Sequence, residues 1–369
     1  MNINIFKYNM FSFKETVTKH KKEYLNTLEE VLDSGIGMLG PKVSELENKL
    51  SEFTGSKHVI CCQSGTSALS LALKSLDIGK GDEVITTPFT WISSTSTIVQ
   101  SGATPVFVDI ELDNYNIDIN LIEDAITDKT KAILIVNIFG KLVNNIEILL
   151  KLKEKYKLYI IEDAAQSFGA FNDDYKSCDG NIGDICCTSF YPTKPLCGFG
   201  DGGACFTNDT NLSNKLKKLR NHGMSSYGEI DMLGWNARMN EFQAGIILVN
   251  LKYFKDKTLK RQELANIYNK NININCVKPN IEEGHMVAQY SILVENREKF
   301  INYLKENNIA HKIFYHKIMI EHKIFENYKT NDLKNATYIK ENIVSIPCYD
   351  SLNEKEINRI IDVINNYKK

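Results

Sequence analysis

The stretch Leu158-Tyr-Ile-Ile-Glu-Asp-Ala-Ala-Gln166 decides the fold, and the rest of the chain is interpreted around it. Its apolar residues follow one another without alternation and end at two carboxylates, Glu162 and Asp163. An uninterrupted apolar run of this kind is typical of a strand covered on both faces, as in a mainly parallel sheet. Six more short β-rich runs precede or follow it: His58–Cys62, Glu83–Thr87, Thr104–Val108, Ala132–Ile138, Cys186–Phe190 and Gly203–Thr207.

Helical patterns lie between several of these seven runs. Ser67–Leu76 has apolar residues at helical spacing, and Ile146–Lys155 follows the fourth run. Alternation of strands and helices predicts a doubly wound α/β domain with a mainly parallel seven-stranded sheet. Ligands of such domains bind at the carboxyl ends of the strands, so the residues just after each run are the candidates for function.

The pattern changes after Asn240, which indicates a second, smaller unit. A long helical segment is expected over Glu241–Lys270, and a helix over Glu15–Leu32 opens the chain. We place a large domain at residues 1–250 and a small α/β domain at 251–369. Four further elements are expected in the small domain: strands over Val287–Val294 and His311–Tyr315, and helices over Glu298–Asn307 and Asn353–Tyr367.

Composition excludes several classes of protein. The 44 basic and 46 acidic residues of the 369 nearly cancel, which argues against a nucleic-acid binder with a broad basic face. The longest apolar runs are too short to span a membrane, and the N-terminus lacks the apolar core of a signal peptide. The nine cysteines form no CxxC pair, so we expect no metal site and reduced thiols in a cytoplasmic enzyme.

A phosphate site is indicated by Ser64-Gly-Thr-Ser-Ala-Leu69, which directly follows the first strand. A glycine turn and hydroxyl residues at the start of a helix offer free N–H groups and the positive end of the helix dipole. The alternative is an ordinary Ser/Thr N-cap. A Walker loop is excluded, because its second glycine and following lysine are missing.

Asp163 and Lys194 are the candidate chemical groups. A carboxylate at the end of a buried strand must be paired, so Asp163 either matches a protonated heterocyclic nitrogen or caps a helix. Lys194 lies between two prolines in the glycine-rich loop Ser189–Gly203. A lysine held at the ligand-binding edge of a sheet is a candidate for Schiff-base formation, because loss of water lowers its pKa.

Trp91 ends Thr87-Pro-Phe-Thr-Trp91, just after the second strand, and is expected either to stack on a planar ligand or to pack in the core. A phosphate cradle, a buried carboxylate, a loop lysine and a stacking ring together make the inventory of a pyridoxal 5′-phosphate (PLP) site.

At this point the sequence resembles the DegT/StrS family of PLP-dependent nucleotide-sugar aminotransferases, from about residue 10 to the C-terminus. The match rests on a series of motifs in the family's order: Leu39-Gly-Pro-Lys-Val-Ser-Glu-Leu-Glu47, Gly81-Asp-Glu-Val-Ile-Thr-Thr-Pro-Phe-Thr90, Gly102-Ala-Thr-Pro-Val-Phe-Val-Asp109, Ile161-Glu-Asp-Ala-Ala-Gln-Ser167, the Lys194 loop, Leu219-Arg-Asn-His-Gly223 and Asn236-Ala-Arg-Met-Asn-Glu241. Ser167–Ala170 and Thr188–Lys194 are most similar to members that make amino sugars for bacterial surface polysaccharides, including lipopolysaccharide and including UDP-3-keto-GlcNAc-uronate 3-aminotransferases.

The resemblance implies the PLP-dependent transferase fold of type I and a role for each matching position. Lys194 would bond covalently to the cofactor and move protons, Asp163 would hold the pyridinium nitrogen, and Gln166 would bond the phenolic oxygen. Further cofactor contacts are expected from the ring of Trp91, from the phosphate ligands Gly65, Thr66 and Ser189, and from Asn236 of a second subunit. Arg238 is a candidate for the substrate's diphosphate or carboxylate, and all five arginines lie after residue 219.

The implied reaction is transfer of an amino group from L-glutamate to C3 or C4 of a nucleotide-linked keto-sugar by a homodimer. A dehydratase of the same family is disfavoured, because there a histidine replaces the lysine that this chain retains. Another fold-type-I PLP enzyme would not carry the whole motif series, and a non-catalytic regulator would be expected to have lost Lys194. The sequence leaves the position aminated, the product's stereochemistry, the exact sugar, its UDP, dTDP or GDP carrier and any assembly beyond a dimer open.

Overall fold

The computed structural model describes residues 10–12, 14–225, 228–330 and 332–368. Its main sheet has seven strands in the order β1-β7-β6-β5-β4-β2-β3. These strands are β1 (His58–Cys62), β2 (Glu83–Thr86), β3 (Thr104–Phe107), β4 (Thr130–Val136), β5 (Tyr159–Asp163), β6 (Ile185–Ser189) and β7 (Gly203–Thr207). All pairs are parallel except those that β7 makes with β1 and β6. The seven predicted strands and the mainly parallel sheet are therefore confirmed.

Helices cover both faces of this sheet, which explains why its strands are apolar without alternation. On one face the core packs against α2 (Pro41–Thr54), α5 (Ile146–Tyr156) and α7 (Glu241–Lys252). On the other face it packs against α3 (Gly65–Ser75), α4 (Ile92–Gln100) and α6 (Thr210–Leu219). Successive residues of each strand alternate between the faces, so Ile160 joins the first core and Ile161 the second.

The outer helix α1 (Lys14–Ser34) lies against α7 rather than against the sheet. Tyr24 contacts Ile246 and Val249 of α7, and its hydroxyl donates to Asn250 Oδ1 at 2.7 Å. This helix was predicted over Glu15–Leu32, which agrees to within two residues at each end.

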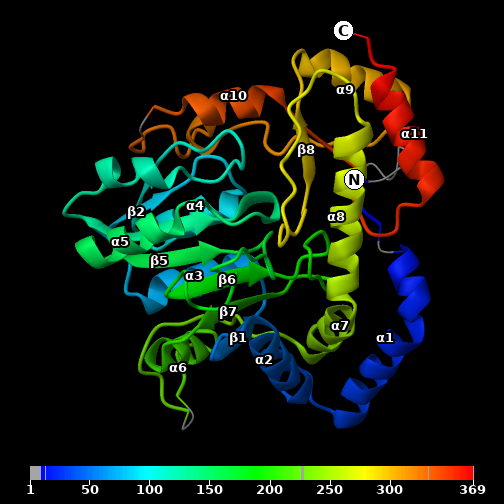
Figure 1. Cartoon of the computed structure of the whole chain (residues 1–369). Coiled ribbons are helices and arrows are strands. Elements are labelled where there is room, and N and C mark those ends of the chain that lie inside the picture. The colour runs from blue at the N-terminus through cyan, green and yellow to red at the C-terminus, as the bar shows by residue number, and fades with distance from the viewer. Residues whose placement is uncertain (1–9, 13, 226–227, 331, 369) are drawn as a thin grey trace.

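The predicted helix over Glu241–Lys270 is two helices in the structure. α7 ends at Lys252, and α8 (Phe254–Asn271) begins after Tyr253, whose φ of −106° and ψ of 5° break the helix. The sequence carries no glycine or proline at this point, which is why the break was not predicted. Figure 1 shows α8 running from the level of the main sheet to the strand β8 (Tyr290–Leu293).

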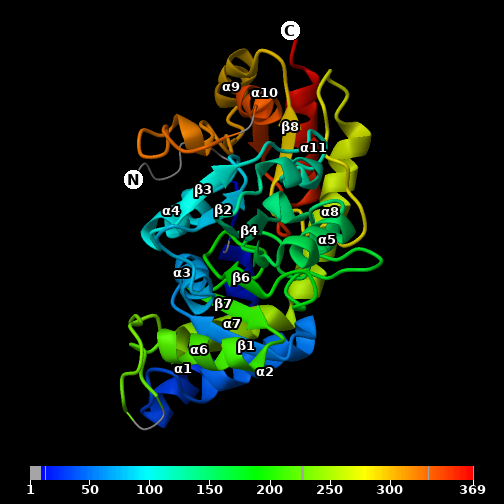
Figure 2. The ribbon, with the colours of Figure 1, turned by 90° about the vertical axis from the view of Figure 1, so that its left-hand side faces the viewer.

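The C-terminal part of the chain has a buried cluster of its own, separate from the two cores of the main sheet. It includes residues of α8, of α9 (Arg297–Glu306), of α11 (Glu354–Asn365) and of a two-stranded antiparallel sheet of β8 and β9 (Ile343–Ile346). In Figure 2, α9, α10 (Lys334–Asn342), β8 and α11 gather at the end of the molecule opposite α1, α2 and α6. The strand predicted over His311–Tyr315 is not formed, because only Lys312 pairs with β9, through a single bridge to Ser345. The domain boundary near residue 250 stays a prediction.

Candidate active site

A cavity of about 540 Å³ opens where β1, β2, β5 and β6 end. The loop or helix that follows each of these four strands contributes lining residues, because the carboxyl ends of parallel strands meet at one edge of the sheet. Seven of the predicted site residues line it: Gly65, Thr66, Trp91, Asp163, Gln166, Ser189 and Lys194. The geometry thus brings together four motifs that are far apart in the sequence.

The start of α3 and the end of β6 form a narrow cradle. An added Cβ on Gly65 would lie 2.7 Å from Ser189 Cβ, and one on Gly203 would lie 2.4 Å from the carbonyl carbon of Ser64. Ser64 Oγ caps the helix by accepting from Ser67 N at 3.1 Å, so the predicted N-cap exists. The first N–H groups of any helix lack a partner within it, and the hydroxyls of Thr66 and Ser189 lie at the same place. The cradle therefore fits a phosphate monoester.

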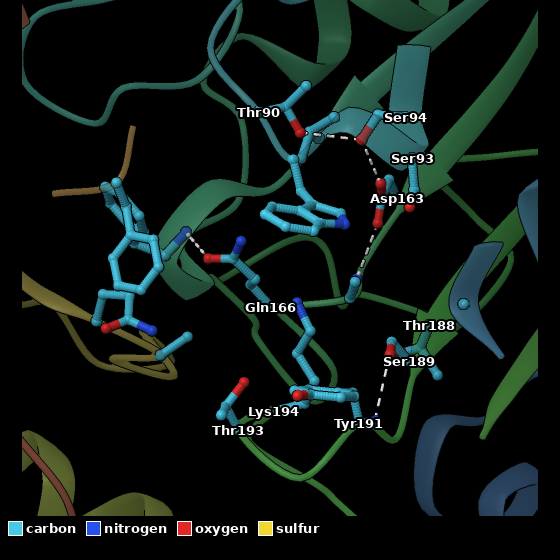
Figure 3. A pocket seen from close by; sticks show the side chains of 18 of the residues that line it. Thr90, Ser93, Ser94, Asp163, Gln166, Thr188, Ser189, Tyr191, Thr193 and Lys194 are labelled. Carbon is cyan, nitrogen blue, oxygen red and sulfur yellow. Dashed lines mark hydrogen bonds between the residues drawn. The ribbon is translucent and has the colours of Figure 1, made fainter. Parts of the chain in front are cut away.

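Asp163 ends β5, and its side chain is almost fully buried. Ser94 Oγ donates to Asp163 Oδ2 at 2.8 Å and Ala165 N donates to Oδ1 at 3.1 Å, while Thr90 and Ser94 share a 2.9 Å hydrogen bond (Figure 3). Residues 165–169 form turns, so the alternative reading of Asp163 as a helix cap is wrong. Burial raises the pKa of Asp163, and the Ser94 and Ala165 hydrogen bonds and the Lys194 charge oppose that rise.

Lys194 extends from the loop after β6 into the cavity, on the side that holds Asp163 and Gln166 (Figure 3). Its backbone N–H donates to Tyr191 O at 2.9 Å, which fixes the loop as a tight turn. Burial lowers the pKa of the Lys194 ammonium, and the Asp163 carboxylate partly offsets that effect. A lysine with a lowered pKa is more often neutral, as a nucleophile and base must be.

Gln166 and Trp91 complete this wall of the cavity. Gln166 Oε1 accepts from Phe139 N at 3.0 Å, and its Nε2 donates to the Tyr315 hydroxyl at 3.3 Å, which leaves one amide hydrogen for a ligand. Trp91 is 59% exposed, so its ring is not part of the core. Trp91 lines the cavity, which is where it must lie if its ring stacks on a planar ligand.

Asn236 and Arg238 do not line the cavity of their own chain. Arg238 Nε donates to Asn236 Oδ1 at 3.0 Å, and both residues lie on a segment that pairs with Asn221 and Cys62. Asn236 is exposed, which agrees with the expectation that it acts on a neighbouring subunit. The roles of both residues stay predictions.

Sequence reasoning missed several lining residues. Ser94 comes three residues after Trp91, but its bond to Asp163 joins residues 69 positions apart and has no local signal. Arg261, Gln289, Lys312 and Tyr315 line the cavity from beyond residue 260. Arg261 lies inside α8, where nothing in the sequence distinguishes it from a surface arginine.

The residues present fit PLP: a phosphate cradle, a buried carboxylate and a lysine with a lowered pKa share one cavity. In the described residues, no helix has the length and apolar composition needed to cross a membrane.

The fold is also that of known enzymes. A Brucella abortus DegT/DnrJ/EryC1/StrS aminotransferase superposes with a TM-score of 0.92 at 32% identity, covering 97% of this chain and 98% of the other.

A second solved structure, NtdA of Bacillus subtilis with bound cofactor PMP, has a TM-score of 0.90 at 27% identity and covers 98% of this chain and 85% of that one. Fold and site thus define a member of the PLP-dependent transferases of fold type I. The chain belongs to the DegT/DnrJ/EryC1/StrS aminotransferase family, whose model matches residues 18–365. One relative is the UDP-2-acetamido-2-deoxy-3-oxo-D-glucuronate aminotransferase of Pseudomonas aeruginosa, 38% identical over 291 residues, which are 78% of this chain and 80% of the relative.

Proposed function

We propose that this aminotransferase moves an amino group from L-glutamate to a nucleotide-linked keto-sugar, with PLP as its cofactor. The observation that carries the proposal is the cavity in which Lys194, Asp163 and the Gly65–Ser189 cradle meet. The product would be an amino sugar for a surface polysaccharide or another glycan.

The phosphate of the cofactor is assigned to the cradle. The N–H groups at the start of α3 and the hydroxyls of Thr66 and Ser189 would bind it, and the helix dipole favours its negative charge. The absence of a side chain on Gly65 leaves room for this close approach.

Asp163, Gln166 and Trp91 would orient the ring. PLP supplies an electron-poor ring that takes up the electrons released when a C–H bond beside its nitrogen breaks. The carboxylate of Asp163, held by Ser94, is suited to keep a ring nitrogen protonated, and Gln166 has a free amide hydrogen for the phenolic oxygen. The exposed indole of Trp91 offers a flat face for stacking.

Lys194 has two tasks in this proposal. It anchors the cofactor covalently, and when substrate has taken its place, its amine moves the proton between substrate and cofactor carbons. Burial favours the neutral amine that both tasks need, because it lowers the pKa of the side chain.

The substrate proposed first is a UDP-linked 3-keto uronate derived from N-acetylglucosamine, because the Pseudomonas aeruginosa relative is named for that sugar. We also propose that the enzyme works in the cytoplasm as a homodimer. Asn236 of each subunit would then reach the cofactor phosphate of the other, and Arg238 would contact the substrate beside it.

The test is the visible absorption spectrum of the PLP-loaded protein before and after L-glutamate. We expect glutamate to remove the band of the lysine-bound cofactor and to produce that of the amine form, and a keto-sugar to restore the first band. UDP-, dTDP- and GDP-linked keto-sugars are compared, and the site of amination is identified in the product.

Lys194→Ala is the matched variant, since it should abolish the lysine-bound band and lower turnover about 10³-fold. Lys217→Ala, on α6, is the control and should behave as wild type. Full turnover in Lys194→Ala, or a band that does not respond to glutamate, would contradict the proposal.

A further inference from the structure

Arg261 is a partly buried guanidinium in the wall of the cavity, and it has no hydrogen bond or ion pair to any residue that the structure describes. Its backbone carbonyl accepts a contact from Cys348 Sγ at 3.8 Å. Asp350 is the carboxylate of this neighbourhood, since it acts on Lys257 and Cys197 as Arg261 does, but it forms no ion pair with Arg261. A guanidinium has five donors in a planar fork and cannot lose its charge, so a partly buried one without a partner is poised for an anion.

Two more side chains that line the cavity, Gln289 and Lys312, have no hydrogen bond or ion pair to a described residue. Gln289 directly precedes β8, whose Tyr290 pairs with Ile346 of β9, and Lys312 pairs with Ser345 on the other side of β9. Cys348, two residues past β9, contacts the Arg261 carbonyl. Strand pairing places Gln289 and Lys312 near the end of β9, the Cys348 contact places Arg261 there, and all three line the cavity.

The charges of the cavity lining support an anionic ligand at this wall. Its carboxylates are Asp163, which faces Lys194, and the exposed Asp201. Its other cations are the half-buried Arg261 and the exposed Lys312, and neither forms an ion pair with a described residue. Lys257, one turn before Arg261 on α8, adds a further cation; burial lowers its pKa, the Cys197 thiol and the Asp350 carboxylate oppose that effect, and the Arg261 charge adds to it.

We infer that Arg261, with Gln289 and Lys312, forms a carboxylate-binding subsite that positions the substrates of this aminotransferase. The inference rests on the proposed function, because that function defines which carboxylates enter the cavity. Two substrates carry a carboxylate that this subsite could bind: the amino donor and a uronate sugar.

A carboxylate suits this wall better than a phosphate does. The planar guanidinium fork matches a planar carboxylate with two parallel hydrogen bonds, and the Gln289 amide and Lys312 ammonium can complete its coordination. In the proposed function the cofactor phosphate has its own donors at Gly65, Thr66 and Ser189, where α3 begins and β6 ends.

The first measurement is the affinity of the PLP-loaded enzyme for glutarate, a dicarboxylate without an amino group, by titration calorimetry. We expect Arg261→Gln to bind glutarate at least tenfold more weakly, and Arg261→Lys to lie between it and wild type, because the charge stays and the fork is lost. Lys312→Gln should give a smaller loss. Arg359→Gln, exposed on α11 and outside the cavity, is the control and should match wild type.

The second measurement separates the two sources. The apparent KM for L-glutamate is compared with the preference of the amine-form enzyme for a UDP-linked 3-keto uronate over the matching 3-keto hexose, which has no carboxylate. A raised KM for glutamate in Arg261→Gln assigns the subsite to the donor, and a lost preference for the uronate assigns it to the sugar.

Unchanged glutarate affinity in Arg261→Gln, together with an unchanged uronate preference, would overturn the inference. A loss of affinity for UDP equal to the loss for glutarate would also overturn it, since the anion would then be the diphosphate. The cofactor band separates this result from failure of the proposed function: Arg261 variants keep a band that responds to saturating glutamate, whereas a wild-type band that never responds would refute transamination itself.

Discussion

At the scale of single residues, Glu162 and Asp163 are neighbours on one strand whose side chains lie on opposite faces of the sheet. Because side chains alternate along β5, Asp163 faces α4 and the cavity, whereas Glu162 points into the core on the other face. There Glu162 accepts from Asn137 Nδ2 at 2.8 Å and from Ser177 Oγ at 2.5 Å. Burial raises the pKa of Glu162 to about 7, despite these hydrogen bonds.

This pKa predicts a pH-dependent stability. In the unfolded chain Glu162 ionises near pH 4, whereas the folded protein keeps its proton up to about pH 7. The unfolded state therefore binds fewer protons in this window, and the free energy of unfolding falls by roughly 3 kcal/mol as pH rises across it. The loss is complete above the folded pKa.

Glu162→Gln removes this titration. Melting temperatures measured from pH 5 to pH 8 should show wild type losing stability relative to the variant as pH rises, while Glu52→Gln, an exposed control on α2, follows wild type. Parallel curves for wild type and Glu162→Gln would show that the carboxyl titrates normally.

At the scale of elements, the N-terminus of α3 is positioned by the strands around it. β1 leads directly into Ser64 and the helix, and β7 lies beside β1 with Gly203 against the Ser64 carbonyl. The end of β6 brings Ser189 to the same point. Three backbone segments thus meet more closely than side chains would allow.

Gly65→Ala should disturb the close contact between the start of α3 and the end of β6. Its Cβ would stand 2.7 Å from Ser189 Cβ and 3.3 Å from Ser189 Cα, so the helix or β6 must shift. We expect PLP affinity to fall at least tenfold and stability to fall by about 1–3 kcal/mol, as for other overpacked sites.

Gly37→Ala is the matched control, because an added Cβ there meets nothing within 4 Å. Cofactor affinity is measured by titrating the apo-protein with PLP, and stability by urea unfolding of the same samples. Wild-type affinity in Gly65→Ala would mean that the phosphate does not bind between α3 and β6.

At the scale of the whole molecule, we propose that the site is completed by a second chain. Asn236 lies on a segment that pairs with the end of β1; it is exposed and is not among the residues that line the cavity of its own chain. An isologous dimer places the same residue of each subunit at the other's site, so each cavity would be completed in trans.

Complementation tests this arrangement. Lys194→Ala and Asn236→Ala are each expected to have low turnover. After the two proteins are mixed, dissociated and reassembled, half of the dimers are mixed and each contains one intact site, so activity should recover to about a quarter of wild type. Mixing Lys194→Ala with Arg359→Gln provides the reference for reassembly.

No recovery beyond the sum of the separate proteins would place Asn236 at the site of its own chain or at no site. Size-exclusion chromatography of wild type at several concentrations supplies the oligomeric state that the interpretation needs.

The sequence by itself determined the sheet and the chemistry along its edge. Each strand is a local run of apolar residues; Asp163 ends one such run and Lys194 lies in the loop after another, so both could be predicted without knowledge of packing. The motif series identified the family for the same reason, since it depends on the order of residues and not on their contacts.

The tertiary structure alone decided which distant residues share the cavity. The Ser94–Asp163 bond and the gathering of Arg261, Gln289 and Lys312 around β9 arise from the packing of helices and from strand pairing across the chain. No local pattern encodes such contacts, because they depend on how complete elements fit together. The break at Tyr253, which sets the course of α8 and hence the place of Arg261, has the same origin.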